Sequence, residues 1–194
     1  MKKEKIRKRL AAAGAICVMA AVLTGGCANP DKAGAKALEN GDYEEAAAQF
    51  EQAASSDDAK EAAEGYRGLG MTYYETGDYE AALEAFGKAI DGGAEQTVQL
   101  YNLAGISAMQ CSDYATALEY IQAGLALADT EPSDQENGEA ESCADMIREM
   151  KFNEIVCYEQ QADWENARQK VTEYLEDYPD DEAAQKEAEF LATR

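Results

Sequence analysis

The chain has 194 residues, with 17 Lys or Arg against 39 Asp or Glu, and a formal net charge of −22. A negative field of this size repels nucleic acid and anionic lipid headgroups, so it excludes nucleic-acid binding. The sequence has no histidine, no glycine-rich phosphate loop and no Gly-x-Ser-x-Gly elbow, which removes the usual general base, nucleophilic triads and phosphate cradles. The composition therefore predicts a protein that is not an enzyme and that uses no cofactor.

The first 26 residues have the pattern of a secretory signal. A basic head at residues 2–9 precedes an apolar run from Leu10 to Leu23, which is shorter than the ~20 residues that a membrane-spanning helix needs. Residues 23–27, Leu-Thr-Gly-Gly-Cys, resemble the bacterial lipobox. That resemblance implies that Cys27 is acylated and becomes the mature N-terminus. Cleavage without lipid and a retained anchor are the alternatives.

Removal of residues 1–26 would also remove six Lys or Arg and one Glu, and would change the net charge to −27. The sequence then divides into a lipidated tether at residues 27–32 and one domain at residues 33–194. Solvated helix faces are the simplest interpretation of the many acids, and attraction to a basic partner or loose association with divalent cations is the other. The expected location is extracytoplasmic, with a lipid anchor in a bacterial membrane.

A short phrase recurs along the domain. Its first three copies start 36 and 35 residues apart, and the residues that follow Tyr79 keep helical three-four spacing in Ala82, Phe86 and Ala89. The Gly-Asp pair that opens the phrase supplies a left-handed turn and a cap for the next helix. A unit of this size cannot bury its own apolar face, so successive units must stack. The copies are Gly41-Asp42-Tyr43, Gly77-Asp78-Tyr79, Ser112-Asp113-Tyr114 and, more weakly, Ala162-Asp163-Trp164.

The second copy resembles the tetratricopeptide repeat (TPR), in which about 34 residues form two antiparallel helices. The resemblance implies an all-α fold: a right-handed superhelix of about four helix-turn-helix repeats with a C-terminal capping helix. The residues that carry it are Tyr66, Leu69, Gly70 and Tyr73 in the first helix and Ala82, Phe86 and Ala89 in the second.

The repeats are expected at about 31–55, 59–91, 97–129 and 139–179, followed by a capping helix at 181–194. The fourth phrase begins 50 residues after the third, and the additional residues include an acidic loop at 129–138. This loop lacks the alternating carboxylates and the following glycine of a helix-loop-helix calcium site, so we expect no metal there. In the fourth repeat, Ile155 occupies a position where the family has a small residue.

Three cysteines lie beyond Cys27: Cys111, Cys143 and Cys157. No pair of them has the spacing of metal ligands. Cys143 and Cys157 are expected on one helix about 21 Å apart, which is too far for a disulfide. A Cys111–Cys157 bridge is an alternative to the simpler interpretation, which is that the three are small buried thiols.

The first helix of each TPR lines a concave groove, so the resemblance implies a partner-binding surface on these helices. Exposed Met, Ile, Phe and Val there would anchor a peptide or a helix, and packing against neighbouring helices is the alternative. Only Arg67 and Asn102 could serve in a clamp for a terminal carboxylate, so an apolar or basic partner segment is expected instead. Helical phase places the following residues on the groove: Arg67, Met71, Tyr74, Asn102, Ile106, Met109, Phe152 and Val156.

The sequence therefore predicts a membrane-anchored extracytoplasmic TPR lipoprotein that acts as a scaffold for another protein of the cell envelope. The alternative is a lipoprotein that captures an extracellular peptide or a cell-wall fragment for uptake or sensing. A spacer without a groove ligand is a third interpretation. No residue predicts the oligomeric state or identifies the partner.

Overall fold

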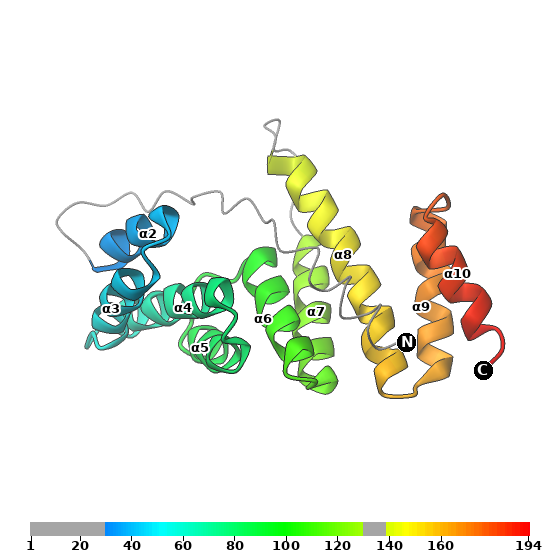
Figure 1. Cartoon of the computed structure of the whole chain (residues 1–194), viewed down its shortest axis with the longest axis horizontal. Coiled ribbons are helices and arrows are strands. Elements are labelled where there is room, and N and C mark those ends of the chain that lie inside the picture. Colours follow the sequence, from blue (N-terminus) through cyan, green and yellow to red (C-terminus); the bar gives the residue numbers. More distant parts are fainter. Residues whose placement is uncertain (1–29, 130–138) are drawn as a thin grey trace.

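The structure, a computed structural model, describes residues 30–129 and 139–194, with side chains from residue 143 onward in the second stretch. The leader, Cys27 and loop residues 130–138 lie outside this part. Every regular element within it is an α-helix (Figure 1). None of these helices is long and apolar enough to cross a membrane. The helices are α2 Pro30–Asn40, α3 Tyr43–Ala54, α4 Ala59–Thr76, α5 Tyr79–Asp91, α6 Val98–Gln110, α7 Tyr114–Ala128, α8 Glu139–Gln160, α9 Trp164–Asp177 and α10 Glu182–Leu191.

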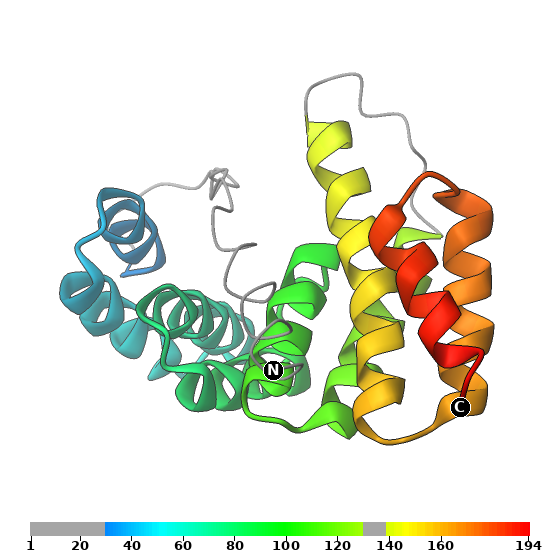
Figure 2. The ribbon, with the colours of Figure 1, turned by 45° about the vertical axis from the view of Figure 1, so that its right-hand side comes forward.

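The helices are arranged as consecutive hairpins. Contacts join α2 to α3, α4 to α5, α6 to α7 and α8 to α9, and each hairpin also contacts the next one through its neighbouring helix. The hairpins follow one another in a row, with α2 at one end and α10 against α9 at the other (Figures 1 and 2). The predicted all-α arrangement of paired helices is confirmed.

Each hairpin turns through a residue with left-handed backbone. The φ angles are 78° at Gly41, 79° at Gly77, 63° at Ser112 and 58° at Ala162. Glycine adopts this conformation without steric cost, whereas a residue with a Cβ does not. The predicted left-handed turn is therefore present at both glycines, and the same turn persists at Ser112 and Ala162 without glycine.

The aspartate after each turn ties the two helices together. The amide of Asp78 donates to the Tyr73 carbonyl at 2.9 Å, and its carboxylate accepts from the Ala81 amide at 3.3 Å. The first bond closes the end of α4 and the second caps the start of α5. The cap predicted for the Gly-Asp pair is confirmed at Asp78, but the side chain of Asp42 makes no capping bond.

Within each hairpin, one position of the first helix lies against one position of the second. A Cβ on Gly70 would lie 2.5 Å from the ring of Phe86, and a Cβ on Gly105 would lie 2.9 Å from Ile121. In the fourth hairpin both partners are fully buried in one cluster. There Ile155 on the first helix is larger than the glycines, and Val171 on the second helix is smaller than Phe86. Ile155 therefore fits where the sequence led us to expect a small residue. The paired positions are Gly34 with Phe50, Gly70 with Phe86, Gly105 with Ile121 and Ile155 with Val171.

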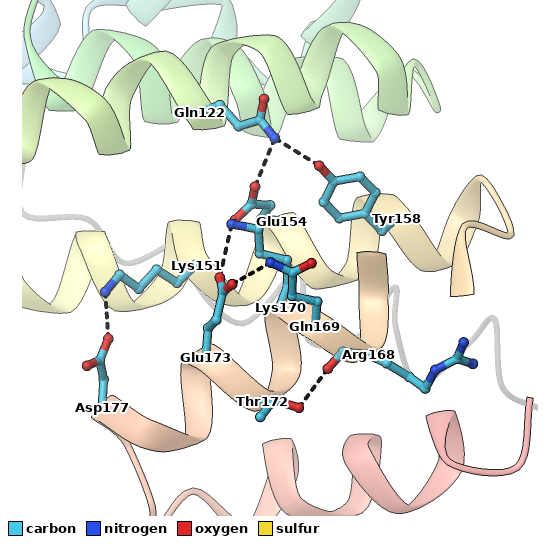
Figure 3. Close-up of polar contacts among 10 residues, drawn as sticks. All are labelled: Gln122, Lys151, Glu154, Tyr158, Arg168, Gln169, Lys170, Thr172, Glu173 and Asp177. Carbon is cyan, nitrogen blue, oxygen red and sulfur yellow. Dashed lines mark hydrogen bonds and ion pairs between the residues drawn. The ribbon is translucent and has the colours of Figure 1, made fainter. Parts of the chain in front are cut away.

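Polar side chains join the fourth hairpin to the third (Figure 3). Glu154 of α8 is only 4% exposed. Its Oε1 accepts from Nε2 of Gln122 in α7 at 2.9 Å, and its Oε2 lies 3.3 Å from Nζ of Lys170 in α9. The Gln122 amide also donates to Oη of Tyr158 at 3.0 Å. A buried carboxylate without partners would be costly, so these contacts fix the relative position of α7, α8 and α9.

The capping helix α10 is attached through Asp181. Its Oδ2 accepts from Nη2 of Arg148 at 2.8 Å and from Oη of Tyr174 at 2.9 Å. Its Oδ1 accepts from the amides of Ala183 and Ala184 at the start of α10. Burial of Asp181 opposes its ionisation, but the hydrogen bonds from Arg148, Tyr174 and the two amides lower its pKa to about 2. One carboxylate therefore links α8, α9 and α10.

Candidate partner-binding surface

The three predicted residues of α4 are all half-buried. Nε of Arg67 lies 2.7 Å from Oε2 of Glu64, in an ion pair within the helix. Glu64 also accepts from the Glu95 amide at 2.8 Å, in the segment between α5 and α6. Met71 packs partly against the buried clusters on both sides of α4, and Tyr74 packs partly against one of them. Arg67 is therefore neutralised, while Met71 and Tyr74 retain exposed apolar surface.

The three predicted residues of α6 lie in the interior. Asn102 is 2%, Ile106 5% and Met109 3% exposed. Helix α6 contacts α4, α5, α7 and α8, so neighbours surround it on several sides. For these three side chains the structure shows packing, and a role in partner binding stays a prediction. Within residues 30–129 and 143–194, Oδ1 of Asn102 has no hydrogen-bond donor.

The two predicted residues of α8 are half-buried and contact different neighbours. The ring of Phe152 packs edge-on against Tyr174 of α9, with ring centroids 5.7 Å apart. Val156 packs partly against the cluster that contains Met150 and Cys157. The predicted set thus divides into five partly exposed residues on α4 and α8 and three buried residues on α6.

Tyr74 lies among aromatic and acidic groups. Its ring packs edge-on against Tyr79 of α5, with centroids 5.7 Å apart and an interplanar angle of 76°. Burial is the main cause that raises the pKa of Tyr74 to about 12, and Tyr79, Glu149 and Glu75 add to it. Helix α6 contacts both α4 and α8, so it lies between the first helices of the second and fourth hairpins.

Neither Glu75 nor Glu149 is neutralised. Burial raises the pKa of each carboxyl above its usual value. Among the residues that the structure describes, no Lys or Arg forms an ion pair with either of them. Neither carboxyl group therefore has a basic partner among the residues that the structure describes.

The sequence analysis missed three residues of this surface. Glu149 lies three residues before the predicted Phe152 on the same helix, so helical phase could have found it. Glu75 lies next to a predicted residue on the same helix. Tyr79 belongs to a second helix, and the phase of the first helices gives no signal for it.

All three described cysteines are free thiols. Cys157 is buried, Cys143 is half-buried and Cys111 is exposed, so the alternative Cys111–Cys157 bridge is not formed and Cys111 is not the buried residue that was expected. Burial, followed by the charge of Glu154, raises the pKa of Cys157 to about 12. A thiol of this kind is protonated at neutral pH and is a poor nucleophile.

The model of the tetratricopeptide repeat family matches residues 32–97 and 67–132. These matches together span more than half of the chain and cover the first three hairpins. The chain belongs to the tetratricopeptide repeat family. TPR proteins are typically scaffolds without enzymatic activity, in agreement with the expectation from the composition.

Solved structures share this TPR fold. YrrB, described as a TPR protein with an unusual peptide-binding site, is 21% identical, with a TM-score of 0.66 over 82% of this chain and 73% of that one. MamA is 15% identical, with a TM-score of 0.65 over 84% of this chain and 78% of that one. At these identities the likeness establishes the fold alone. No curated protein sequence matches the chain.

Proposed function

We propose that this TPR protein is a scaffold that binds a protein or peptide partner through the surface of α4 and α8. The observation that carries the proposal is the partial exposure of Met71 and Tyr74 on α4. Methionine and aromatic side chains of this kind anchor partner segments because they bury a large apolar area with adaptable shape. The peptide-binding site described for YrrB supports a peptide or protein as the kind of partner.

We further propose that the scaffold works at the outer side of a bacterial membrane. The support is in the sequence: a leader at residues 1–26 and the lipobox-like segment that ends in Cys27. Helix α2 begins at Pro30, so the last three residues of the predicted 27–32 tether belong to that helix and residues 27–29 would connect the lipid to it. Three extended residues reach at most about 10 Å, so the tether would keep the repeats close to the bilayer.

Site-specific photo-crosslinking in cells tests the scaffold. Benzoylphenylalanine would replace the exposed Glu75 beside Tyr74, and a matched variant would carry it at the exposed Glu119 on the outer helix α7. We expect a discrete protein adduct with the probe at Glu75 and none with the probe at Glu119. Identical adducts at both positions, or no protein adduct at Glu75, would contradict protein scaffolding and favour ligand capture or a spacer.

Metabolic labelling with an alkyne fatty acid tests the anchor. We expect the intact chain to be labelled and to sediment with membranes, and the Cys27→Ser variant to lose both the label and the sedimentation. A control variant with Cys111→Ser keeps both, because that thiol lies in the folded domain. Equal labelling of intact chain and Cys27→Ser would refute lipidation at this residue.

A further inference from the structure

The predicted leader and the domain have opposite charges. Residues 1–26 contain six Lys or Arg and one Glu, which gives a formal charge of +5, whereas the rest of the chain carries −27. The apolar run of the leader, from Leu10 to Leu23, contains no charged residue. In water such a run gains free energy when it is buried against another apolar surface. An uncleaved chain therefore joins a basic, apolar segment to an acidic domain.

The domain has accessible apolar surface on two of its first helices. Contacts join α2 to α4, α4 to α6 and α6 to α8, so these first helices follow one another side by side. Four apolar side chains on α4 and α8 are only partly covered by the described residues, and helical phase assigns them to the groove. They are the half-buried Met71 and Tyr74 on α4 and Phe152 and Val156 on α8.

The leader is long enough to reach this surface. Residues 24–29 separate the apolar run from Pro30 at the start of α2, and six extended residues reach at most about 20 Å. Packed helices lie about 8–10 Å apart, so α4 is one helix spacing from α2, and α6 is two. The run has 14 residues and would form a helix about 21 Å long. This length matches the two spacings from α4 across α6 to α8.

We propose that residues 10–23 of the uncleaved leader dock on the surface of α4 and α8 and keep it closed until the leader is removed. The tether holds the leader and the surface at a high effective concentration, so docking within one chain costs little translational entropy. This inference rests on the proposed scaffold function. It assigns a first occupant to the partner-binding surface and makes partner binding depend on removal of the leader.

Charge favours the leader over the domain of a second copy as the occupant. Two domains with a formal charge of −27 each repel one another, whereas a leader with a charge of +5 is attracted to the domain. The basic head at residues 2–9 supplies this attraction, and the apolar run supplies the contact with the surface. Binding therefore depends on the apolar character of the run and not on charge alone, which substitutions can separate.

The test is photo-crosslinking within the purified full chain, made by cell-free synthesis without membranes so that the leader is retained. Benzoylphenylalanine replaces the exposed Glu75 beside Tyr74 or, as the matched position, the exposed Glu119 on α7. Mass spectrometry of the digested protein identifies the segment that each probe has captured. An equal mixture of heavy-isotope-labelled and unlabelled chains distinguishes adducts within one chain from adducts between two.

We expect the probe at Glu75 to capture residues 10–23 of its own chain, and the probe at Glu119 to capture none of them. Val18→Asp with Val22→Asp places two charges in the apolar run and should abolish the adduct. The matched variant, Thr24→Asp with Ala28→Asp, adds the same charges at the same spacing outside the run and should retain it. Circular dichroism verifies that each variant is folded.

Equal effects of the two double variants would overturn the proposal, because docking would then follow charge alone. The absence of a leader adduct at Glu75, equal adducts at both probe positions, or adducts that join different chains would also overturn it. If cells give a partner adduct at Glu75 but the full chain gives no leader adduct, the scaffold function stands and this inference fails. If the leader adduct forms but cells give no partner adduct, docking of the leader stands and the scaffold function fails.

Discussion

The second and fourth hairpins form the same helix pair with different interiors. In the second hairpin, a glycine on α4 lets the ring of Phe86 approach the helix backbone. In the fourth hairpin, Ile155 and Val171 share the space more evenly. An interior tolerates such a change when a smaller side chain on one helix makes room for a larger one on the other. The pair Gly105 and Ile121 of the third hairpin is smaller than either, so the hairpin geometry accepts different combinations at these two positions.

The hairpins also differ in their polar contacts. The fourth hairpin is connected to its neighbours by Glu154 and Asp181, which bind partners on α7, α9 and α10. The Gly-Phe contact of the second hairpin involves apolar atoms alone. We infer that the second hairpin depends mainly on burial, and the fourth more on charge-assisted hydrogen bonds whose strength changes with pH and salt.

Truncation of the paired residue on the second helix should give the largest difference between the hairpins. Phe86 is 0% and Val171 2% exposed. We expect Phe86→Ala to lower the free energy of unfolding by about 4 kcal/mol, and Val171→Ala by about 2 kcal/mol, because the larger ring leaves the larger cavity. Urea denaturation followed by circular dichroism measures both values. Equal losses would break the proposed contrast.

Loss of the Arg148 guanidinium should weaken the attachment of α10. We expect Arg148→Met, which retains part of the stem, to destabilise the chain by about 1–2 kcal/mol, because Tyr174 and Asp181 lose a charged donor. Arg168 on α9 is exposed, and its guanidinium extends away from the labelled polar contacts (Figure 3), so Arg168→Met should change stability by less than about 0.5 kcal/mol. Hydrogen exchange of the α10 amides provides the measurement, and equal exchange in both variants would contradict the role of Arg148.

The two ends of the protein should respond to acid in opposite directions. The folded-state pKa of Asp181 is about 2, below its ordinary value of 3.8, so its stabilising effect is present above about pH 4 and is lost as the pH falls toward 2. We expect a contribution of about 1 kcal/mol after allowance for solvent. At Asp31 in α2, burial, followed by the charges of Glu61 and Glu64, raises the pKa above its ordinary value of 3.8. The stabilising effect of the protonated Asp31 is therefore lost as the pH rises above 3.8 and passes the raised pKa.

Urea midpoints of the intact chain and of Asp181→Asn, measured over the range from about pH 6 to pH 2.5, isolate the contribution of Asp181. The difference between the two chains should shrink on acidification. A difference that stays constant across this range would mean that the carboxylate of Asp181 is not the titrating group.

The smallest effect is expected at the turns. Ala162 has a φ of 58°, whereas Gly77 has a φ of 79°. Ala162→Gly should stabilise the chain by about 0.5 kcal/mol, because relief of the left-handed strain exceeds the entropic cost of glycine. Gly77→Ala should destabilise it by about 1 kcal/mol. Thermal unfolding of the two variants gives the signs, and two shifts in the same direction would contradict this account.

The repeat phrase was sufficient to predict the all-α architecture, because turn residues and three-four spacing act locally. Whether a predicted groove residue is exposed or buried depends on how helices far apart in the sequence pack together. Helical phase assigns Ile106 to a face of α6 but does not show how closely the neighbouring helices approach that face. The phrase located the turn at Ser112 as well, although a non-glycine residue there gave no signal for the left-handed φ of 63° that the structure shows.

The contrast between two free thiols, one exposed and one buried, provides a built-in chemical probe for local opening of the repeat stack. Cys157 is completely enclosed between the third and fourth hairpins, and Cys111 is exposed at the end of α6. A thiol reagent can label Cys111 at once, but it reaches Cys157 only when the interface separates. In a Cys143→Ser background, the slow phase of labelling would report how often the last repeat detaches from the stack, and ligands or substitutions could be ranked by how much they slow it.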